Sequence, residues 1–250
     1  VSISHLTVTI FEKPAGEPTV EMVDDATAAF KSSNSEVVVA LGGGSVIDTA
    51  KAARLCAQLN CTFREFQAQT PNYPAPTVAL IAIPTSAGTG SEVTPISIIT
   101  VGEEEKKGVS SAIILPDIAI LDPDLTIGLP AHTTAATGID AMVHAIEAYT
   151  SASKNNNPIS KMLAIEALKL LAGSLEKVVF DGSDIEARGN MLIGAMLAGK
   201  AFANSPVAAV HALAYPIGGT FHVSHGLSNS LVLPYVLRFN SADSKTTKNY

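Results

Sequence analysis

Apolar positions in the first 130 residues form short runs that alternate with helical patterns. EVVVAL, which begins at residue 36, is β-branched and predicts a strand, and VIDTAKAARLCAQL after GGGS has the apolar spacing of a helix. A second predicted strand, TVALIAI, runs into the turn PTSAGTGSEVT. SSAIILPDIAILDPDL supplies two shorter extended runs, which Pro116 separates. Strands that alternate with crossover helices predict a parallel sheet of the Rossmann-like kind.

After residue 130 the β-branched runs disappear and the apolar period becomes helical. TTAATGIDAMVHAIEAYTS, ISKMLAIEALKLLAGSLEKVV and IEARGNMLIGAMLAGKAF each predict a helix, and a histidine-bearing helical segment continues to Asn240. The change of period marks a predicted domain boundary. We expect an α/β domain over residues 1–130 and an all-α domain over residues 131–250.

Composition and charge narrow the classes of partner. The chain has 16 Lys and Arg against 23 Asp and Glu, a formal charge of −7, and it contains no basic stripe, so nucleic acid is not an expected partner. No run approaches the roughly 18 apolar residues of a membrane span, and the first residues do not resemble a signal peptide. These features predict a soluble, cytoplasmic protein with no membrane partner. Its two cysteines, Cys56 and Cys61, are expected to be reduced structural thiols.

Two glycine-rich turns follow predicted strands. GGGS opens a helix, where free backbone N–H groups and the positive end of the helix dipole suit a phosphate. Alone, this turn is explained at least as well by a tight bend, because it matches neither GxGxxG nor a P-loop. TSAGTGSE follows the next strand, and neighbouring strand ends of an α/β sheet line one crevice. Two such turns together favour a long phosphorylated ligand, whereas Asp48 and Lys51 are expected to pair locally.

The helical half contains a carboxylate and three imidazoles that suit a divalent metal. Asp140 and His144 lie four residues apart on an otherwise apolar helix, which places them on one face. His211 and His225 follow in the last segment, and the four together fit iron(II) or zinc. A single buried histidine such as His211 is more often a hydrogen-bonded core residue, but the set is not explained that way. The remaining histidines, His5, His132 and His222, are expected to have structural roles. Glu147 is expected to be either a polar neighbour of the site or a member of a structural pair.

Five motifs, in order, resemble the iron-containing (group III) alcohol dehydrogenases: GGGSVIDTAKA, PTSAGTGSEVT, LDPDLTIGLP, ATGIDAMVHAIEAYTS and VHALAYPIGGTFHVSHGLSNSLVLPYVLRFN. The resemblance implies a nucleotide-binding α/β domain and an all-α domain, an architecture shared with dehydroquinate synthase, with the metal and NAD or NADP in the cleft between them. It implies iron(II), or alternatively zinc, held by Asp140, His144, His211 and His225. It implies cofactor contacts at Gly42, Gly43, Gly44, Ser45, Thr85, Ser86, Thr94 and Lys107, with Lys106 as the alternative to Lys107.

The resemblance also implies the reaction, hydride transfer between an alcohol and the cofactor, and a homodimer that acts on a small alcohol or aldehyde. At Tyr215 many family members have a histidine that helps to move the proton, so Tyr215 is the candidate catalytic residue. The family's first strand-helix unit and last helices are not found in this chain. Two alternatives stay open, a metal- and NAD-using sugar-phosphate cyclase of the dehydroquinate synthase kind and a catalytically silent binding protein.

Overall fold

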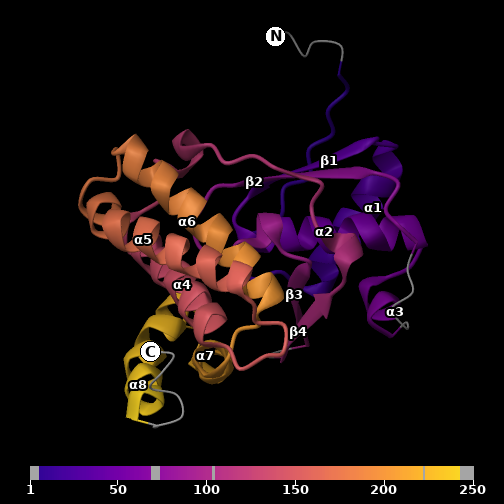
Figure 1. The fold of residues 1–250 in the computed structure, drawn as a ribbon. Helices are drawn as coiled ribbons and strands as arrows, with labels where there is room; N and C mark the ends of the chain where they lie inside the picture. Colours follow the sequence, from indigo (N-terminus) through magenta and orange to yellow (C-terminus); the bar gives the residue numbers. More distant parts are fainter. Residues whose placement is uncertain (1–5, 69–73, 103–104, 222, 243–250) are drawn as a thin grey trace.

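The computed structural model describes residues 6–68, 74–102, 105–221 and 223–242. Its α/β half and its helical half lie side by side (Figure 1). Strands β1 (Val37–Gly42), β2 (Ala79–Pro84) and β5 (Ile118–Ala119) form a parallel sheet in the order β1-β2-β5. The predicted strands EVVVAL and TVALIAI are confirmed, and so is the predicted fold class, a Rossmann-like parallel sheet followed by an all-α unit. We propose that the α/β domain ends at residue 130 and that the all-α domain begins at residue 131.

Helices cover the sheet because their apolar faces need burial. Helix α2 (Gly44–Leu59) begins directly after β1 and buries Ile47, Leu55 and Cys56. Helix α1 (Val20–Ser33), which the sequence analysis does not identify, packs on α2 and starts at Thr19, whose hydroxyl accepts a hydrogen bond from the Met22 N–H. The short helix α3 (Phe63–Ala68) contributes Phe63 to the same core.

Two features of the α/β half differ from the prediction. Strands β3 (Ile96–Val101) and β4 (Glu105–Ser110) form an antiparallel hairpin outside the parallel sheet. The first half of SSAIILPDIAIL is a 3-10 turn, η2 (Ala112–Ile114), instead of a strand. Arg54 explains this, because its guanidinium donates to the carbonyls of Ile113 and Leu115 and replaces a strand partner there. Two more 3-10 turns, η1 (Ser91–Val93) and η3 (Pro123–Thr126), complete this half.

Three long helices form the centre of the second half: α4 (Ala131–Thr150), α5 (Pro158–Phe180) and α6 (Ile185–Asn204). Their shared core is dominated by alanine, which lets the helix backbones approach closely. Asn157 caps α5 through a reciprocal pair of hydrogen bonds with Ser160, and Pro158 occupies the first turn. The three helices predicted from apolar spacing are therefore confirmed.

Helices α7 (Ala209–Phe221) and α8 (His225–Ala242) pack below α4 (Figure 1). Pro216, Gly218 and Gly219 all lie inside α7, which continues to Phe221. A proline inside a helix removes one hydrogen bond without preventing further turns. The chain reverses just before His225, the first residue of α8.

The two halves meet where the loop after β2 touches α6 backbone to backbone. A Cβ atom at Gly90 would lie 2.7 Å from the Cα of Gly199, and one at Gly199 would lie 3.0 Å from the Cα of Gly90. Gly90 also has φ +62°, a conformation that favours glycine. Both positions therefore require glycine in this arrangement.

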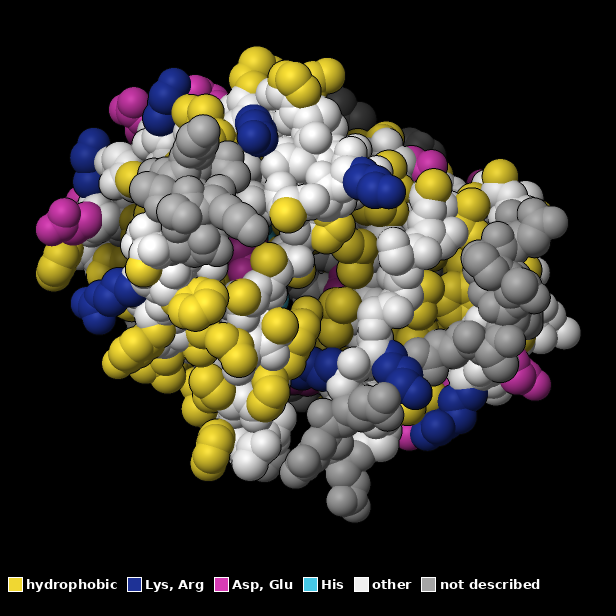
Figure 2. Space-filling view, turned by 60° about the horizontal axis from the view of Figure 1, so that its bottom comes forward, with side chains coloured by type: hydrophobic (Ala, Val, Ile, Leu, Met, Phe, Trp, Pro, Cys, Tyr) yellow, Lys and Arg dark blue, Asp and Glu magenta, His cyan; other side chains and the backbone are white. Residues whose placement is uncertain are grey.

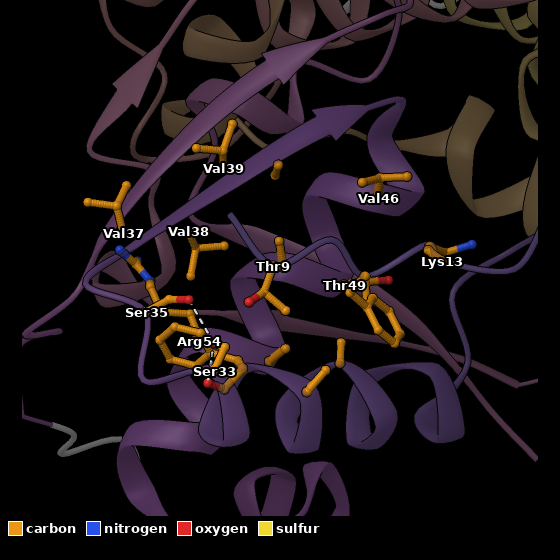
Figure 3. Close-up of a pocket in the computed structure, with 17 residues that line it drawn as sticks. Thr9, Lys13, Ser33, Ser35, Val37, Val38, Val39, Val46, Thr49 and Arg54 are labelled. Atoms are coloured by element: carbon orange, nitrogen blue, oxygen red, sulfur yellow. Dashed lines mark hydrogen bonds between the residues drawn. The ribbon is translucent and has the colours of Figure 1, made fainter. Parts of the chain in front are cut away.

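Among the described residues, two groups of exposed apolar side chains stand close to hollows or gather on one side. One is beside β1, where Val37, Val39 and Leu41 are exposed and a mainly apolar cavity of about 160 Å³ lies between residues 9–13, α1, β1 and α2 (Figure 3). The other is on the helical half, where Figure 2 shows hydrophobic side chains gathered on the side turned towards the viewer. Within the described ranges no single helix is long and apolar enough to cross a membrane, and α6 with α7 meets these criteria only as a pair bent by 106°.

Candidate metal and cofactor site

One face of α4 carries three acidic or imidazole side chains. Asp140, His144 and Glu147 follow one another at intervals of four and three residues, so they share a side of the helix, and all three are buried. Apolar and small residues fill the other buried positions of α4. Burial of such groups is unfavourable without partners, and most of their partners come from α7, α8 and the residues just before α7.

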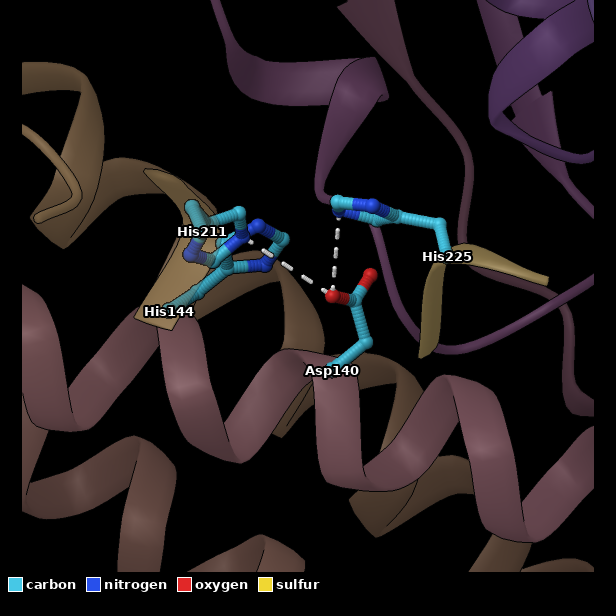
Figure 4. A group of neighbouring side chains, drawn as sticks. All are labelled: Asp140, His144, His211 and His225. Carbon is cyan, nitrogen blue, oxygen red and sulfur yellow. Dashed lines mark ion pairs between the residues drawn. The ribbon is translucent and has the colours of Figure 1, made fainter. Parts of the chain in front are cut away.

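Four candidate ligands come together between α4, α7 and α8. Asp140, His144, His211 and His225 each offer an atom, and these atoms all lie within 4.8 Å of one another (Figure 4). The Asp140 Oδ1 atom lies 3.9 Å from His211 Nε2 and 3.5 Å from His225 Nε2. The His144 ring stacks between His211 and Phe202, with centroid distances of 4.6 and 4.4 Å. The structure thus brings the predicted ligand set together.

Burial and neighbouring charges set the protonation of this cluster. Burial lowers the pKa of His144 to about 4, although the Asp140 carboxylate opposes the shift. The pKa of His225 is lowered for the same reasons. Burial alone would raise the pKa of Asp140, but the three histidines and Asn229 hold it below its usual value. At neutral pH the site therefore presents an ionised carboxylate and imidazole lone pairs.

This donor set fits a divalent transition metal. Imidazole nitrogens and a carboxylate oxygen are ligands for zinc and iron(II), and ligands must be deprotonated to bind. Because burial keeps His144 neutral, its imidazole has a lone pair available for a metal. The negative charge of the Asp140 carboxylate would offset part of the positive charge of a bound cation.

Glu147 supports the cluster from behind. Its carboxylate accepts hydrogen bonds from His211 Nδ1 at 2.7 Å and from the N–H groups of Ala208 and Val210 at 2.9 and 2.6 Å. These bonds lower the pKa of Glu147 despite its burial. Because Glu147 accepts the Nδ1 proton, the lone pair of His211 is on Nε2, which faces Asp140. Glu147 is thus a polar neighbour of the site that also anchors the start of α7.

Asn229 is a further polar residue of the site, and the sequence analysis does not identify it. Its side-chain N–H group donates to Asp140 Oδ1 at 2.6 Å, and the residue is fully buried. The available signal is its position four residues after His225, on the same face of α8.

A cavity of about 590 Å³ lies beside the cluster and receives side chains from both halves. The four candidate ligands and Tyr215 line it from the helical half, and Gly44, Ser45 and Thr94 line it from the α/β half. Its volume lies within the usual range for small-molecule sites. The start of α2 therefore opens towards the same space as the four candidate ligands.

The two glycine-rich turns touch each other, as their strands predict. The Thr85 N–H donates to the Gly42 carbonyl at 3.0 Å, and a Cβ atom at Gly44 would lie 2.6 Å from the Thr89 side chain. Gly43 is the N-cap of α2 and faces Ser86. Gly42, Gly43, Thr85 and Ser86 thus belong to the paired turns, outside the set of residues that line the cavity.

The two candidate lysines on β4 differ in position. Lys106 lines the cavity and forms an ion pair with Glu17 at 3.1 Å, whereas Lys107 is exposed and does not line it. Neighbouring residues of a strand point to opposite faces, so only one of the two can face the cleft. This position favours Lys106, the alternative that the resemblance allows, over Lys107.

Tyr215 lies at the cluster, four residues after His211 on α7. Its ring stacks on that of His225 with centroids 5.7 Å apart and lies 6.4 Å from that of His211. Burial and the carboxylates of Asp140, Glu147 and Asp48 raise the pKa of Tyr215. The phenol therefore keeps its proton at neutral pH.

Family models match almost the whole chain. The model described as iron-containing alcohol dehydrogenase matches residues 2–123, and the C-terminal model of the Fe-containing alcohol dehydrogenase family matches residues 134–250. The chain belongs to the iron-containing alcohol dehydrogenase family.

The chain is also similar to individual proteins and solved structures. Long-chain-alcohol dehydrogenase 1 of Geobacillus thermodenitrificans (strain NG80-2) is 44% identical over 93% of this chain and 58% of its own length. A 1,3-propanediol oxidoreductase structure matches with a TM-score of 0.88 and 37% identity over 94% of this chain and 61% of its own. Sulfoacetaldehyde reductase from Bifidobacterium kashiwanohense, solved with NAD+, matches with a TM-score of 0.87 and 33% identity over 93% and 62%. The chain thus spans about 60% of the length of these relatives.

Asp48 and Lys51 of this iron-containing alcohol dehydrogenase make hydrogen bonds within the α/β half. Lys51 is fully buried and donates to Ser91 Oγ and the Ile96 carbonyl, and Asp48 accepts from Ser91 and the Ile98 N–H. Cys56 and Cys61 are free thiols, and burial raises the pKa of both. His132 is exposed, and His5 and His222 lie outside the described residues.

Proposed function

We propose that the full protein is an NAD(P)-dependent, metal-dependent alcohol dehydrogenase, which transfers a hydride between a small alcohol and the cofactor. One observation carries the proposal: a buried Asp-His₃ cluster and a glycine-rich helix start open onto the same cavity. Membership of the iron-containing alcohol dehydrogenases supports it, and one similar structure was solved with NAD+.

In this proposal Asp140, His144, His211 and His225 hold iron(II), or alternatively zinc. The cofactor contacts the paired turns and the cavity wall at Gly42, Gly43, Gly44, Ser45, Thr85, Ser86 and Thr94, with Lys106 in preference to Lys107. When bound, the metal supplies Lewis-acid stabilisation of the alcohol oxygen and the nicotinamide supplies the hydride acceptor.

The chain's own residues position the reactants and the proton. The backbone N–H groups at the start of α2 suit the cofactor phosphates, because they lie at the positive end of the helix. The candidate metal ligands and the start of α2 line the same cavity, so an alcohol and the cofactor bound there would lie near one another. Such proximity is the main requirement for direct hydride transfer. The Tyr215 phenol lies at the cluster and is proposed to relay the alcohol proton as a hydrogen-bond donor and acceptor.

The sugar-phosphate cyclase alternative is not favoured. A multiply charged substrate would require several cationic side chains. Among the described lining residues the only lysine or arginine is Lys106, which already pairs with Glu17. In the helical half, Arg188 donates to Thr134 and Gly182, and Lys200 is exposed.

A single assay tests the proposal against both alternatives. The full-length protein, treated with chelator and reloaded with iron(II) or zinc, is mixed with NAD or NADP and a panel of short alcohols, and absorbance of the reduced cofactor is followed. We expect reduced cofactor to form only with metal present. Absence of reduction with every alcohol and both cofactors would refute the dehydrogenase proposal.

Expectations about partners and location belong to the same proposal. We expect a homodimer in the cytoplasm that acts on small alcohols or aldehydes and requires neither nucleic acid nor a membrane. Light scattering coupled to gel filtration measures the oligomeric state, and a mass equal to that of one chain would contradict the dimer.

A further inference from the structure

Asn229 reaches three of the four candidate ligands with one amide. Its Nδ2 atom lies 2.6 Å from Asp140 Oδ1, 3.3 Å from His225 Nε2 and 3.4 Å from His211 Nε2. The residue is 0% exposed and lies one turn after His225 on α8. No other described side chain outside the ligand set makes a hydrogen bond to Asp140.

The chemistry of the contact identifies the atom that faces Asp140. A carboxylate oxygen only accepts, so the amide atom 2.6 Å away must be the nitrogen, because two oxygens would repel each other. A hydrogen bond to an ionised oxygen is short and strong. Asparagine supplies this donor without charge, whereas a lysine would compete with a cation and an aspartate would repel Asp140.

Packing alone does not explain why an asparagine is present at position 229. Asn229 Oδ1 is buried and has no hydrogen-bond partner among the described residues. An unsatisfied buried acceptor is unfavourable, and an apolar residue of similar size would avoid it. Apolar contacts already join α8 to α4 through Val143, Val232 and Val236.

We propose that Asn229 is a positioning residue, which holds Asp140 Oδ1 towards the histidines and thereby raises the affinity of the site for a divalent metal. Figure 4 shows this oxygen turned towards His211 and His225, which is the orientation that the amide contact fixes. The inference rests on the proposed metal site. It assigns a role to a residue of α8 that is not itself one of the proposed ligands.

The test measures metal affinity in the full-length protein with Asn229→Leu and Asn229→Ala. Zinc, and iron(II) under anaerobic conditions, are titrated in competition with a chromophoric chelator. We expect both variants to bind each metal about 10- to 100-fold more weakly, the usual effect of losing a residue that orients a ligand. Ser228→Ala is the matched control, because Ser228 is equally buried in α8 but donates only to the Val223 and Ser224 carbonyls.

The variant His225→Ala distinguishes a failure of the proposed metal site from a failure of the role proposed for Asn229. If His225→Ala binds metal like the wild type, the proposed ligand set fails. If His225→Ala loses the metal while both Asn229 variants keep wild-type affinity, the positioning role alone is overturned.

Thermal unfolding in chelator and in excess zinc covers variants that fold poorly. A positioning role predicts that the Asn229 variants lose part of the zinc-induced rise in melting temperature. An equal drop in melting temperature under both conditions, with that rise intact, would show a purely structural role and overturn the inference.

Discussion

At the scale of single residues, Glu147 links the cluster to the fold. Its carboxylate accepts from the His211 ring and from two N–H groups at the start of α7. One side chain therefore sets the tautomer of His211 and the position of the helix that carries it.

We expect Glu147→Gln to weaken zinc binding about 10- to 100-fold, because a neutral amide holds the His211 proton less firmly. Chelator competition measures the affinity. Glu166→Gln is the control, since Glu166 is an exposed carboxylate on α5 that pairs with Lys169 at 3.0 Å. Equal zinc affinity in the two variants would contradict the orienting role.

Tyr215→Phe tests the proton relay. If the phenol relays the proton, kcat should fall by roughly 10² or more with metal content unchanged. Tyr215→His should remain active with a lower pH optimum, because an imidazole titrates near neutrality whereas burial and nearby carboxylates raise the pKa of the tyrosine. Turnover near wild type in Tyr215→Phe, with an unmoved pH profile, would remove Tyr215 from the catalytic residues.

At the scale of elements, the turn between β1 and α2 contains two glycines with different roles. Gly43 leaves the backbone open to a ligand, whereas Gly44 leaves room for the packing of Thr89. A Cβ atom at Gly43 would meet only the Ser86 hydroxyl, at 3.5 Å, whereas one at Gly44 would clash with Thr89 at 2.6 Å. Side chains at Gly43 thus test ligand binding with little effect on folding. Side chains at Gly44 would disturb both.

We expect Gly43→Val to raise the KM for NAD or NADP at least about tenfold, because a branched side chain blocks approach of the phosphates to the backbone. Metal content should not change. Gly189→Ala is the control, since a Cβ atom there has nothing within 4 Å. Unchanged cofactor KM in a folded Gly43→Val protein would leave the turn with only a structural role.

The elements also show what the sequence can predict. EVVVAL and the long helices are found because their apolar periods are continuous, and Asp140 and His144 are found because they interrupt such a period. The hairpin β3–β4 is missed because its second strand, EKKGVS, is charged and has the pattern of a solvated loop. Asn229 is missed because a single asparagine in a helix has no periodic signal, and its role depends on how α8 crosses α4.

At the scale of the whole molecule, the buried histidines couple folding to pH. Burial lowers the pKa of His144 from 6.5 to about 4, so in this window the unfolded chain binds the extra proton and the folded chain does not. Stability is therefore full above pH 6.5 and falls as the pH drops towards 4. The lowered pKa values of His225, Asp140 and Glu147 act in the same direction.

We expect the chelator-treated protein to lose about 2 kcal/mol of unfolding free energy between pH 7 and pH 5 through His144 alone. Urea unfolding at both pH values measures it. His144→Leu should reduce the pH dependence, and His132→Ala, a change at an exposed position, is the control. A free energy that does not change with pH would contradict the buried, neutral state of His144.

The contact between Gly90 and Gly199 has a consequence for inherited variation. Because each lies on the other's backbone, a larger residue at either position forces the α/β half away from α6. In a library of random variants selected for soluble protein, codons 90 and 199 should therefore keep glycine far more often than exposed Gly128, where a Cβ atom meets nothing within 4 Å. A change at codon 90 would have to be offset elsewhere in the loop or in α6, so related genes should replace such neighbours together.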